Sequence, residues 1–193
     1  MNIAFQELDS LIRSVERLAK TNGRVIVAID GRCASGKTTL ASAIAEKTGA
    51  AVFHMDDFFL RPEQRTEARL SEPGGNVDRE RFLCEVLSPL AEGKSAIVFR
   101  PFDCGTMSLS SPATVYAGKI AIVEGSYCLH PDLCGYYGLR VFLTVSREEQ
   151  MRRLILRDPS KAAAFSERWI PMEERYFEAF GVASLCDLCI STG

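Results

Sequence analysis

The sequence predicts a three-layer α/β fold built on a parallel sheet of five strands. Short runs of apolar, β-branched residues alternate along the chain with longer segments whose apolar residues recur at helical spacing. This alternation is typical of parallel strands joined by crossover helices. The length of 193 residues suits a single folding unit with its own core. We therefore expect one domain, residues 1–193, without a linker or an internal repeat.

The first elements follow in order from the N-terminus. Residues 1–22 predict an amphipathic helix, because acidic residues interrupt the apolar ones. RVIVAID (24–30) is the first buried strand, and a glycine-rich turn follows it. The next helix begins at Lys37 and ends near Gly49, and AVFHM (51–55) is the second strand.

The middle of the chain is less regular. Residues 56–77 are rich in charge, Pro and Gly, and they predict a long loop or lid with about one helical turn. Asp78 is a suitable N-cap for a helix that stops at Gly93, and SAIVF (95–99) is the next strand. A second irregular stretch covers residues 100–118.

Two apolar strands and two helical stretches complete the chain. KIAIVEG (119–125) has a carboxylate near its C-terminal end, and LRVFLTVS (139–146) follows it. Helical sequence covers 147–157, inside a segment (147–160) that we expect to act as a lid, and again about 162–180. LCDLCIS is the last short strand.

Composition excludes several classes of protein. Hydrophobic residues make up 47% of the chain and charged residues 25%, which are ordinary globular values. The formal charge of -2 provides no broad positive field, so we expect no nucleic-acid partner, and an anionic substrate would need a local basic pocket. Because the N-terminus lacks a secretion signal and no apolar run reaches about 18 residues, we expect a cytoplasmic protein without a membrane partner.

The seven cysteines are scattered along the chain, and we expect reduced thiols. Cys186 and Cys189 form a CxxC, which could be half of a zinc site or a redox pair. There is no second CxxC, and both histidines lie far away in sequence. The preferred interpretation is two small apolar residues on the last strand.

The glycine-rich turn GRCASGKT (31–38) fits the phosphate-loop pattern GxxxxGK[ST]. It leaves a predicted strand and opens a predicted helix, as phosphate binding requires. The glycines let successive N–H groups converge on phosphate oxygens, and the helix N-terminus adds its positive dipole end. We expect this turn to bind ATP through Gly31, Ala34, Ser35, Gly36, Lys37, Thr38 and Thr39.

Individual side chains of this turn have different expected roles. Lys37 supplies a charge to the β and γ phosphates, and the Thr38 hydroxyl ligates Mg²⁺. Thr39 touches the α phosphate or is an ordinary helix residue. Glu124 is the candidate magnesium carboxylate, because parallel strands bring their C-terminal ends to one crevice and a buried charge needs a cation. The alternative for Glu124 is a solvated position at the rim.

HMDDFF (54–59) places two carboxylates at the end of the second strand. Phosphoryl transfer to an alcohol needs a carboxylate that accepts the hydroxyl proton. Asp56 is the first candidate for this base and Asp57 the second, because adjacent side chains point in opposite directions. The alternative for both is a loop carboxylate that caps the following turn.

The predicted lid helix carries Arg152, Arg153 and Arg157. Arg153 and Arg157 share a face by their i,i+4 spacing, so both are candidate catalytic residues that clamp the transferring phosphate. The alternative is a solvated basic face that pairs with Glu148 and Glu149.

In their order, these motifs resemble the uridine kinase branch of P-loop kinases, with nicotinamide riboside kinases as near relatives. The likeness extends from Arg24 onward and includes the NVD of 76–78, the PFD of 101–103, the VEG of 123–125 and the RD of 157–158, besides the loop and MDDFF. It implies a P-loop NTPase fold, ATP with Mg²⁺, and phosphorylation of a hydroxyl on a nucleoside-like molecule.

The resemblance also implies substrate contacts. Asp56 matches the family's base, Phe58 or Phe59 matches the aromatic residues that contact the substrate, and Asp78 matches the Asp that holds the ribose hydroxyls. Phe102 and Asp103 match the family's YD, which reaches the nucleobase of the substrate.

The chain departs from the family in three places. Met107 stands where the family has a His, NVDRER lacks the HP of NFDHP, and FSERW replaces an ERGRD-like segment, so Arg168 substitutes for a family arginine. Other acceptors therefore stay open, among them nicotinamide riboside, pantothenate and a sugar phosphate. A GTPase would need an NKxD element, which is absent. A non-catalytic nucleotide-binding module, GTP in place of ATP, and a homo-oligomer stay open as well.

Overall fold

The structure, a computed structural model, describes residues 5–193, and its centre is a parallel sheet of five strands in the order β2-β7-β1-β8-β9. The predicted sheet is thereby confirmed. β1 lies in the middle, paired in parallel with β7 and β8, while β2 pairs with β7 and β9 with β8. The strands are β1 (Val25–Gly31), β2 (Ala51–His54), β7 (Ile120–Glu124), β8 (Leu139–Thr144) and β9 (Leu188–Ser191).

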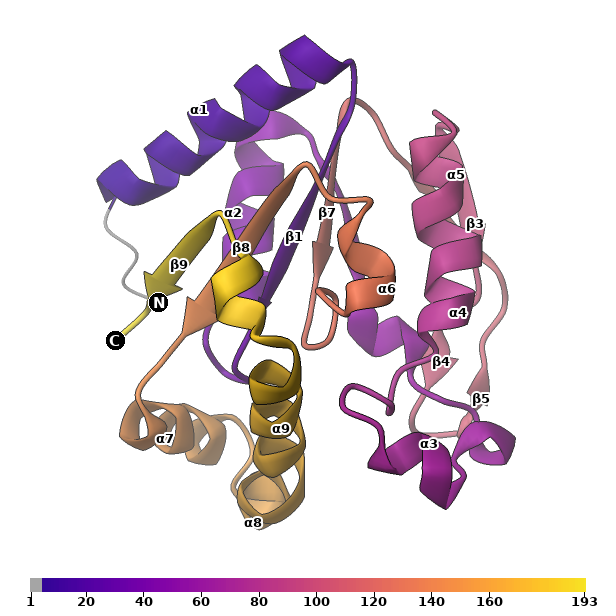
Figure 1. Cartoon of the computed structure of the whole chain (residues 1–193), viewed down its shortest axis with the longest axis vertical. Coiled ribbons are helices and arrows are strands. Elements are labelled where there is room, and N and C mark those ends of the chain that lie inside the picture. Colours follow the sequence, from indigo (N-terminus) through magenta and orange to yellow (C-terminus); the bar gives the residue numbers. More distant parts are fainter. Residues whose placement is uncertain (1–4) are drawn as a thin grey trace.

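Helices cover both faces of this sheet and make three layers (Figure 1). One face packs against α1 (Phe5–Asn22) and α2 (Lys37–Thr48). The other face packs against α6 (Pro131–Cys134), α9 (Ile170–Phe180) and the helical run of 79–91. The first four residues of the predicted N-terminal helix lie outside the described part of the chain. No helix within residues 5–193 is long and apolar enough to cross a bilayer.

The predicted helix after Asp78 is present, with a wide turn in its middle. It consists of α4 (Arg79–Phe82), the π turn Leu83–Leu87 and α5 (Ser88–Ala91), and the Asp78 side chain caps its start. The π turn lies just before Pro89, which has no N–H to donate and would crowd the carbonyl four residues earlier. The helical stretch of 162–180 has the same arrangement, with α8 (Ala162–Ala164) and the π turn Phe165–Trp169 leading to Pro171 in α9.

The predicted strand of 95–99 forms, but outside the main sheet. β3 (Ala96–Phe99) pairs antiparallel with β6 (Ala113–Tyr116), and β4 (Phe102–Asp103) pairs with β5 (Ser108–Leu109). The expectation of an irregular stretch over 100–118 is therefore wrong in part. The side chains of β3 alternate between exposed and buried, which suits a two-stranded ribbon with one solvated face rather than a fully buried parallel strand.

The long segment of 56–77 contains more helical structure than the sequence indicates. It includes the 3₁₀ turns Met55–Phe58 and Pro62–Gln64 and the short helix α3 (Glu67–Ser71). Arg69 organises the end of this segment, because its guanidinium donates to the carbonyls of Gly75 (3.0 Å) and Val77 (2.9 Å) and pairs with Glu80. The segment is therefore a structured wall rather than a featureless loop.

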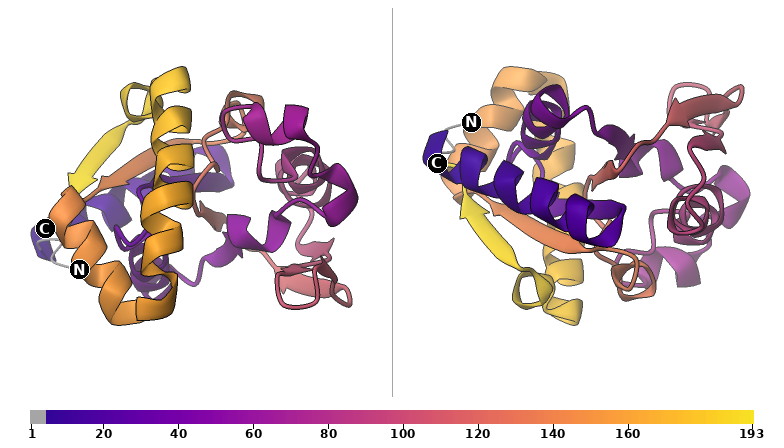
Figure 2. Two further views of the ribbon diagram at one scale, coloured as in Figure 1. Left: turned by 90° about the horizontal axis from the view of Figure 1, so that it is seen from below. Right: turned by 90° about the horizontal axis from the view of Figure 1, so that it is seen from above.

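The last part of the chain lies at the carboxyl ends of the strands. α7 (Arg147–Arg157) begins at its N-cap Ser146 and matches the predicted helix, and the 3₁₀ turn Pro159–Lys161 follows it. A further 3₁₀ turn, Val182–Leu185, leads into β9. Figure 2, left, looks onto this edge, with the helices from α7 to α9 on one side and the α3 segment on the other.

The CxxC cysteines have no metal-site environment. Their thiols donate to backbone carbonyls, Cys186 to Val182 (3.2 Å) and Cys189 to Ala183 (3.3 Å). Within residues 5–193, no three His, Cys, Asp or Glu side chains are grouped in a way that could hold a metal ion.

Candidate active site

The phosphate loop joins β1 to α2 at the carboxyl edge of the sheet. Ala34 (φ 58°) and Gly36 (φ 96°) have left-handed backbone conformations that turn the loop tightly. The Leu40 amide donates to the Gly36 carbonyl (2.9 Å), so the earlier amides of α2 have no acceptor inside the helix. These free amides at the positive end of the helix dipole are the donor set that a polyphosphate requires.

Gly31 lets the loop leave the sheet in close contact with β8. A Cβ on Gly31 would lie 1.9 Å from the Leu143 carbonyl oxygen, and the φ of Gly31 is +136°, so only glycine fits. Lys37 is held at the same place, because its Nζ donates to the carbonyls of Gly31 (2.7 Å) and Arg32 (3.0 Å). The loop therefore holds one ammonium charge beside its own amides.

Thr38, in the first turn of α2, and Glu124, the last residue of β7, are brought together at the carboxyl edge of the sheet. The Thr38 hydroxyl donates to Glu124 Oε1 (3.0 Å), and His54 Nδ1 lies 2.6 Å from the same oxygen. The hydrogen bond to Glu124 raises the pKa of His54. Glu124 is buried, so the solvated rim position does not describe it. His54 was not predicted from the sequence, although it lies one residue before the end of the predicted strand AVFHM.

Asp56 and Asp57 follow β2 but differ in where they lie. Asp56 lines the main cavity, whereas Asp57 does not. The Asp56 side chain is exposed to the open cavity, but the loss of solvation inside the site raises its pKa, and the nearby Lys37 ammonium opposes that change. Burial also raises the pKa of Asp57. The cavity therefore presents one of the two carboxylates to a bound molecule.

Asp30, the last residue before the loop glycine, was not singled out from the sequence. It is fully buried and accepts hydrogen bonds from the amides of Gly31 (2.7 Å), Tyr127 (3.3 Å) and Leu129 (2.9 Å) and from the Tyr176 hydroxyl (2.9 Å). Burial raises the pKa of Asp30 to about 6, against the lowering by these hydrogen bonds. Asp30 thus ties the loop to the turn after β7 and to α9.

Glu173 on α9 is a second buried carboxylate that the sequence analysis missed. It accepts hydrogen bonds from the Cys33 amide (2.9 Å) and the Ser126 hydroxyl (2.6 Å), and it lines the cavity. Its neighbour Glu174 forms a paired contact with the Arg32 guanidinium (2.6 and 2.9 Å). Two adjacent carboxylates therefore fasten α9 to the phosphate loop. No local sequence pattern predicts this arrangement.

The candidate arginines differ in how many contacts their guanidinium groups already make. Arg153 lines the cavity, but its guanidinium already contacts Glu149 (2.8 Å), the Ala34 carbonyl (3.1 Å) and Thr192. Arg152 pairs with Glu149 as well (2.6 Å). Arg157 is exposed at the cavity with its guanidinium 5.3 Å from the Phe165 ring centre. Of these side chains, Arg157 is therefore the freer one to approach a phosphate.

Several residues that the resemblance assigned to the substrate lie away from the cavity wall. Phe58 is fully buried against Phe82 (ring centres 4.9 Å apart). Asp78 is buried and accepts from the Gln64 amide nitrogen (2.8 Å) and the Arg81 amide (3.1 Å). Phe102 and Asp103 do not line the cavity either.

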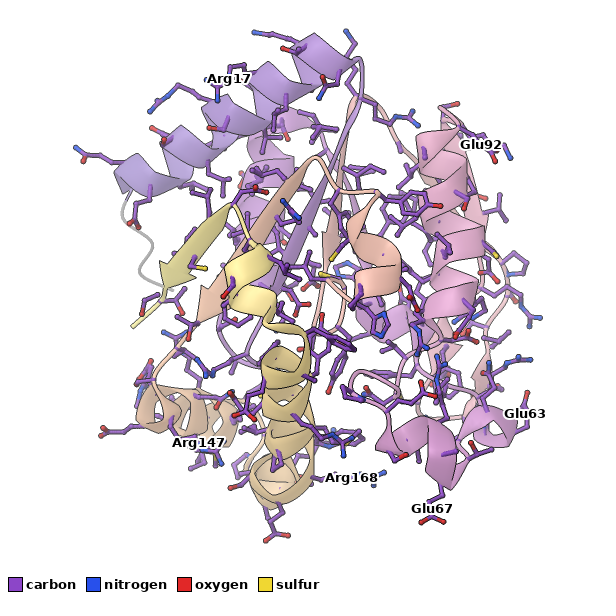
Figure 3. The ribbon with its side chains drawn as sticks, viewed as in Figure 1. Arg17, Glu63, Glu67, Glu92, Arg147 and Arg168 are labelled. Carbon is purple, nitrogen blue, oxygen red and sulfur yellow. The ribbon has the colours of Figure 1, made fainter. Side chains whose placement is uncertain are left out.

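Phe59 and Arg168 do line the cavity, whose volume is about 960 Å³. Arg168 lies in the π turn that precedes α9, and Figure 3 shows it on the side of α9 that faces the segment carrying α3. The wall also includes residues that the sequence analysis did not assign to the substrate, namely Arg65, Leu70, Asn76, Cys104, Tyr127, Trp169 and Met172. The volume lies within the range of natural ligand pockets.

Known proteins resemble the chain in sequence and in fold. No family model matches the chain. The chain is 30% identical over 203 residues to a bifunctional alpha-galactosidase/sucrose kinase of Mediterraneibacter gnavus, an alignment that covers 91% of this chain. The aligned part of the chain spans only 22% of that relative's length.

Two solved structures share the fold over nearly the whole chain. A possible uridine kinase from Bacillus stearothermophilus has a TM-score of 0.65 at 21% identity, covering 94% of this chain and 99% of that one. YFH7 of Saccharomyces cerevisiae, a proposed P-loop containing kinase with a circular permutation, has a TM-score of 0.62 at 12% identity, covering 96% and 99%. The chain therefore has the fold of the uridine kinase-like P-loop kinases that its sequence resembles.

Proposed function

We propose that this protein is a kinase that transfers the γ-phosphoryl group of ATP to an alcohol of a small molecule. The observation that carries the proposal is one cavity whose wall contains the phosphate loop, the hydrogen-bonded pair of Thr38 and Glu124, and the Asp56 carboxylate. A triphosphate site beside a carboxylate open to the same space is what in-line transfer to a hydroxyl requires.

In the proposed reaction, the acceptor hydroxyl gives its proton to Asp56 while its oxygen bonds to the γ-phosphorus. The bond between that phosphorus and the β-γ bridging oxygen breaks, and ADP leaves. The raised pKa of Asp56 makes it a better proton acceptor than an ordinary surface carboxylate. Lys37 and Arg157 stabilise the negative charge on the transferring group.

The residues present also suit Mg²⁺. A hydroxyl and a carboxylate oxygen are ligands that this ion accepts, and Thr38 and Glu124 provide them side by side. Bound Mg²⁺ would neutralise charge on the phosphate oxygens. His54 orients the Glu124 carboxylate through its hydrogen bond, as partners of metal-binding side chains commonly do.

The acceptor class is the open part of the proposal. The nucleoside-like acceptor follows from the sequence resemblance, but Asp78, Phe102 and Asp103 lie off the cavity wall. The relative described as a sucrose kinase adds carbohydrates to the candidate acceptors. Both classes carry the primary alcohol that the proposed chemistry needs.

The test is a coupled ADP-release assay with ATP or GTP and a panel of nucleosides, sugars, nicotinamide riboside, pantothenate and sugar phosphates. Asp56→Asn should lower kcat on the best acceptor by about 10²- to 10⁴-fold. Asp57→Asn is the matched control, since Asp57 is adjacent but off the cavity wall, and its kcat should change by less than about threefold.

Two results would contradict the proposal. If no acceptor raises the rate of ADP release above the rate with ATP alone, the protein is a nucleotide-binding module without transfer. If Asp56→Asn keeps the full rate, another group accepts the proton.

A further inference from the structure

Two buried polar atoms in the cavity wall have no hydrogen-bond partner among residues 5–193. They are Oδ1 of Asn76 and Oη of Tyr127, on residues that are 7% and 4% exposed. Both residues line the cavity. Unpaired buried polar groups are uncommon in native proteins, and each one calls for a physical explanation. At the wall of a ligand cavity, the simplest explanation is that a bound molecule supplies the partner.

The two side chains are held next to each other. The Asn76 amide is near enough to lower the pKa of the Tyr127 hydroxyl, although burial, the larger influence, raises it. No hydrogen bond of acceptable geometry joins the two groups. The Asn76 backbone carbonyl accepts from the Leu60 amide (3.3 Å), and the Tyr127 ring packs edge-on against Tyr176 (5.0 Å between centres). The main chain at Asn76 and the ring of Tyr127 are therefore both held at the cavity wall.

Glu173 adds a carboxylate to the same wall. Each of its oxygens accepts one hydrogen bond, from Cys33 or from Ser126, and keeps a free lone pair. An amide, a phenol and a carboxylate together need a group that both donates and accepts, which is the property of a hydroxyl.

We propose that Asn76, Tyr127 and Glu173 form the acceptor subsite and recognise neighbouring hydroxyls on a ring. The proposal rests on the proposed kinase function. The ring belongs either to a free sugar or to the ribose of a nucleoside, because both present the same pair of hydroxyls. Asp78, to which the resemblance assigns this task, already has the Gln64 side chain (2.8 Å) and the Arg81 amide (3.1 Å) as partners.

The decisive comparison is Tyr127→Phe with Tyr137→Phe. Tyr137 also has a buried hydroxyl without a partner in the described part of the chain, but Tyr137 does not line the cavity. Removing an unpaired buried hydroxyl should raise the Tm of either protein, without substrate, by about 2–4 °C. Only Tyr127→Phe should also raise the KM for the acceptor, by about 3- to 10-fold, with the KM for ATP unchanged.

Asn76→Ala provides a second variant that should show the same division between the two KM values. Thermal unfolding of each variant establishes that it is folded. If the KM for the acceptor stays within twofold in both Tyr127→Phe and Asn76→Ala while the wild type is active, the subsite is refuted and the kinase function stands. A wild type that phosphorylates nothing refutes the kinase function itself.

The acceptor panel separates the two sources of the ring. Sucrose and glucose represent free sugars, and uridine represents nucleosides, with 2′-deoxyuridine as the analogue that lacks the hydroxyl pair. Preference for a sugar identifies that source, and preference for uridine over 2′-deoxyuridine by about tenfold or more identifies the ribose. Preference for 2′-deoxyuridine over uridine, with no sugar accepted, overturns the proposal.

Discussion

Replacing Gly31 with alanine tests whether the close approach of β1 and β8 positions the phosphate loop. The new Cβ would lie 1.9 Å from the Leu143 carbonyl oxygen and 2.7 Å from the carbonyl carbon. That oxygen accepts the Arg32 amide (3.1 Å), so it cannot retreat without loss of a hydrogen bond, worth about 1 kcal/mol. The φ of +136° adds strain of about 1–3 kcal/mol for an L residue. With the steric displacement of β8 included, we expect a loss of about 3–5 kcal/mol of unfolding free energy.

Gly49→Ala is the matched control for this change. Gly49 also has a positive φ (+69°), but nothing lies within 4 Å of its added Cβ. Gly49→Ala should therefore lower the unfolding free energy only by the backbone strain, about 1 kcal/mol. Urea unfolding at equilibrium measures both variants, through the midpoint at an unchanged m value. If Gly31→Ala loses no more free energy than Gly49→Ala, close contact with β8 does not constrain the loop and the argument fails.

Three further predictions concern the carboxylates of the site. Tyr176→Phe removes one of the four donors to Asp30 and should lower the urea-unfolding free energy by about 1 kcal/mol, and an unchanged midpoint would show that this hydroxyl contributes nothing. Because the loss of solvation inside the site raises the pKa of Asp56, the base is protonated at a higher pH than an ordinary Asp, so kcat/KM should fall as the pH drops through a value above 3.8. In Asp56→Asn, kcat/KM should no longer fall in this way at low pH. If the fall persists, another group causes it. Glu124→Gln should raise the Mg²⁺ concentration for half-maximal ADP release by about tenfold or more, and an unaltered requirement would remove Glu124 from the metal site.

Local patterns carried much of the fold prediction. The buried strands β1, β7 and β8 appear in the sequence as apolar runs, and the helix α2 ends at a glycine, as its sequence indicates. The phosphate loop is likewise a local feature, because its glycines, Lys37 and Thr38 act within eight consecutive residues. The apolar run SAIVF could not be placed in the same way, since a strand that pairs outside the main sheet can have the same composition.

The candidate site was predictable where its residues belong to the phosphate loop or lie at a strand end. Thr38 and Glu124 could be paired from the sequence, because the loop follows β1 and parallel strands bring their carboxyl ends together. The same rule could not choose between Phe58 and Phe59, since a 3₁₀ turn decides which ring enters the core. Nor could it show that Asp78 is occupied by the cap of its own helix.

By itself, the sequence determined the order of the elements and the phosphate loop, because hydrogen bonding, backbone freedom and apolar periodicity act over a few neighbouring residues. Only the tertiary structure decided which distant groups share the cavity. The donors to Asp30 include Tyr176, which is 146 residues away, and Glu173 reaches the Cys33 amide from 140 residues away. Such contacts depend on how α9 packs across the sheet, and that packing is set by the whole core rather than by any segment of the chain.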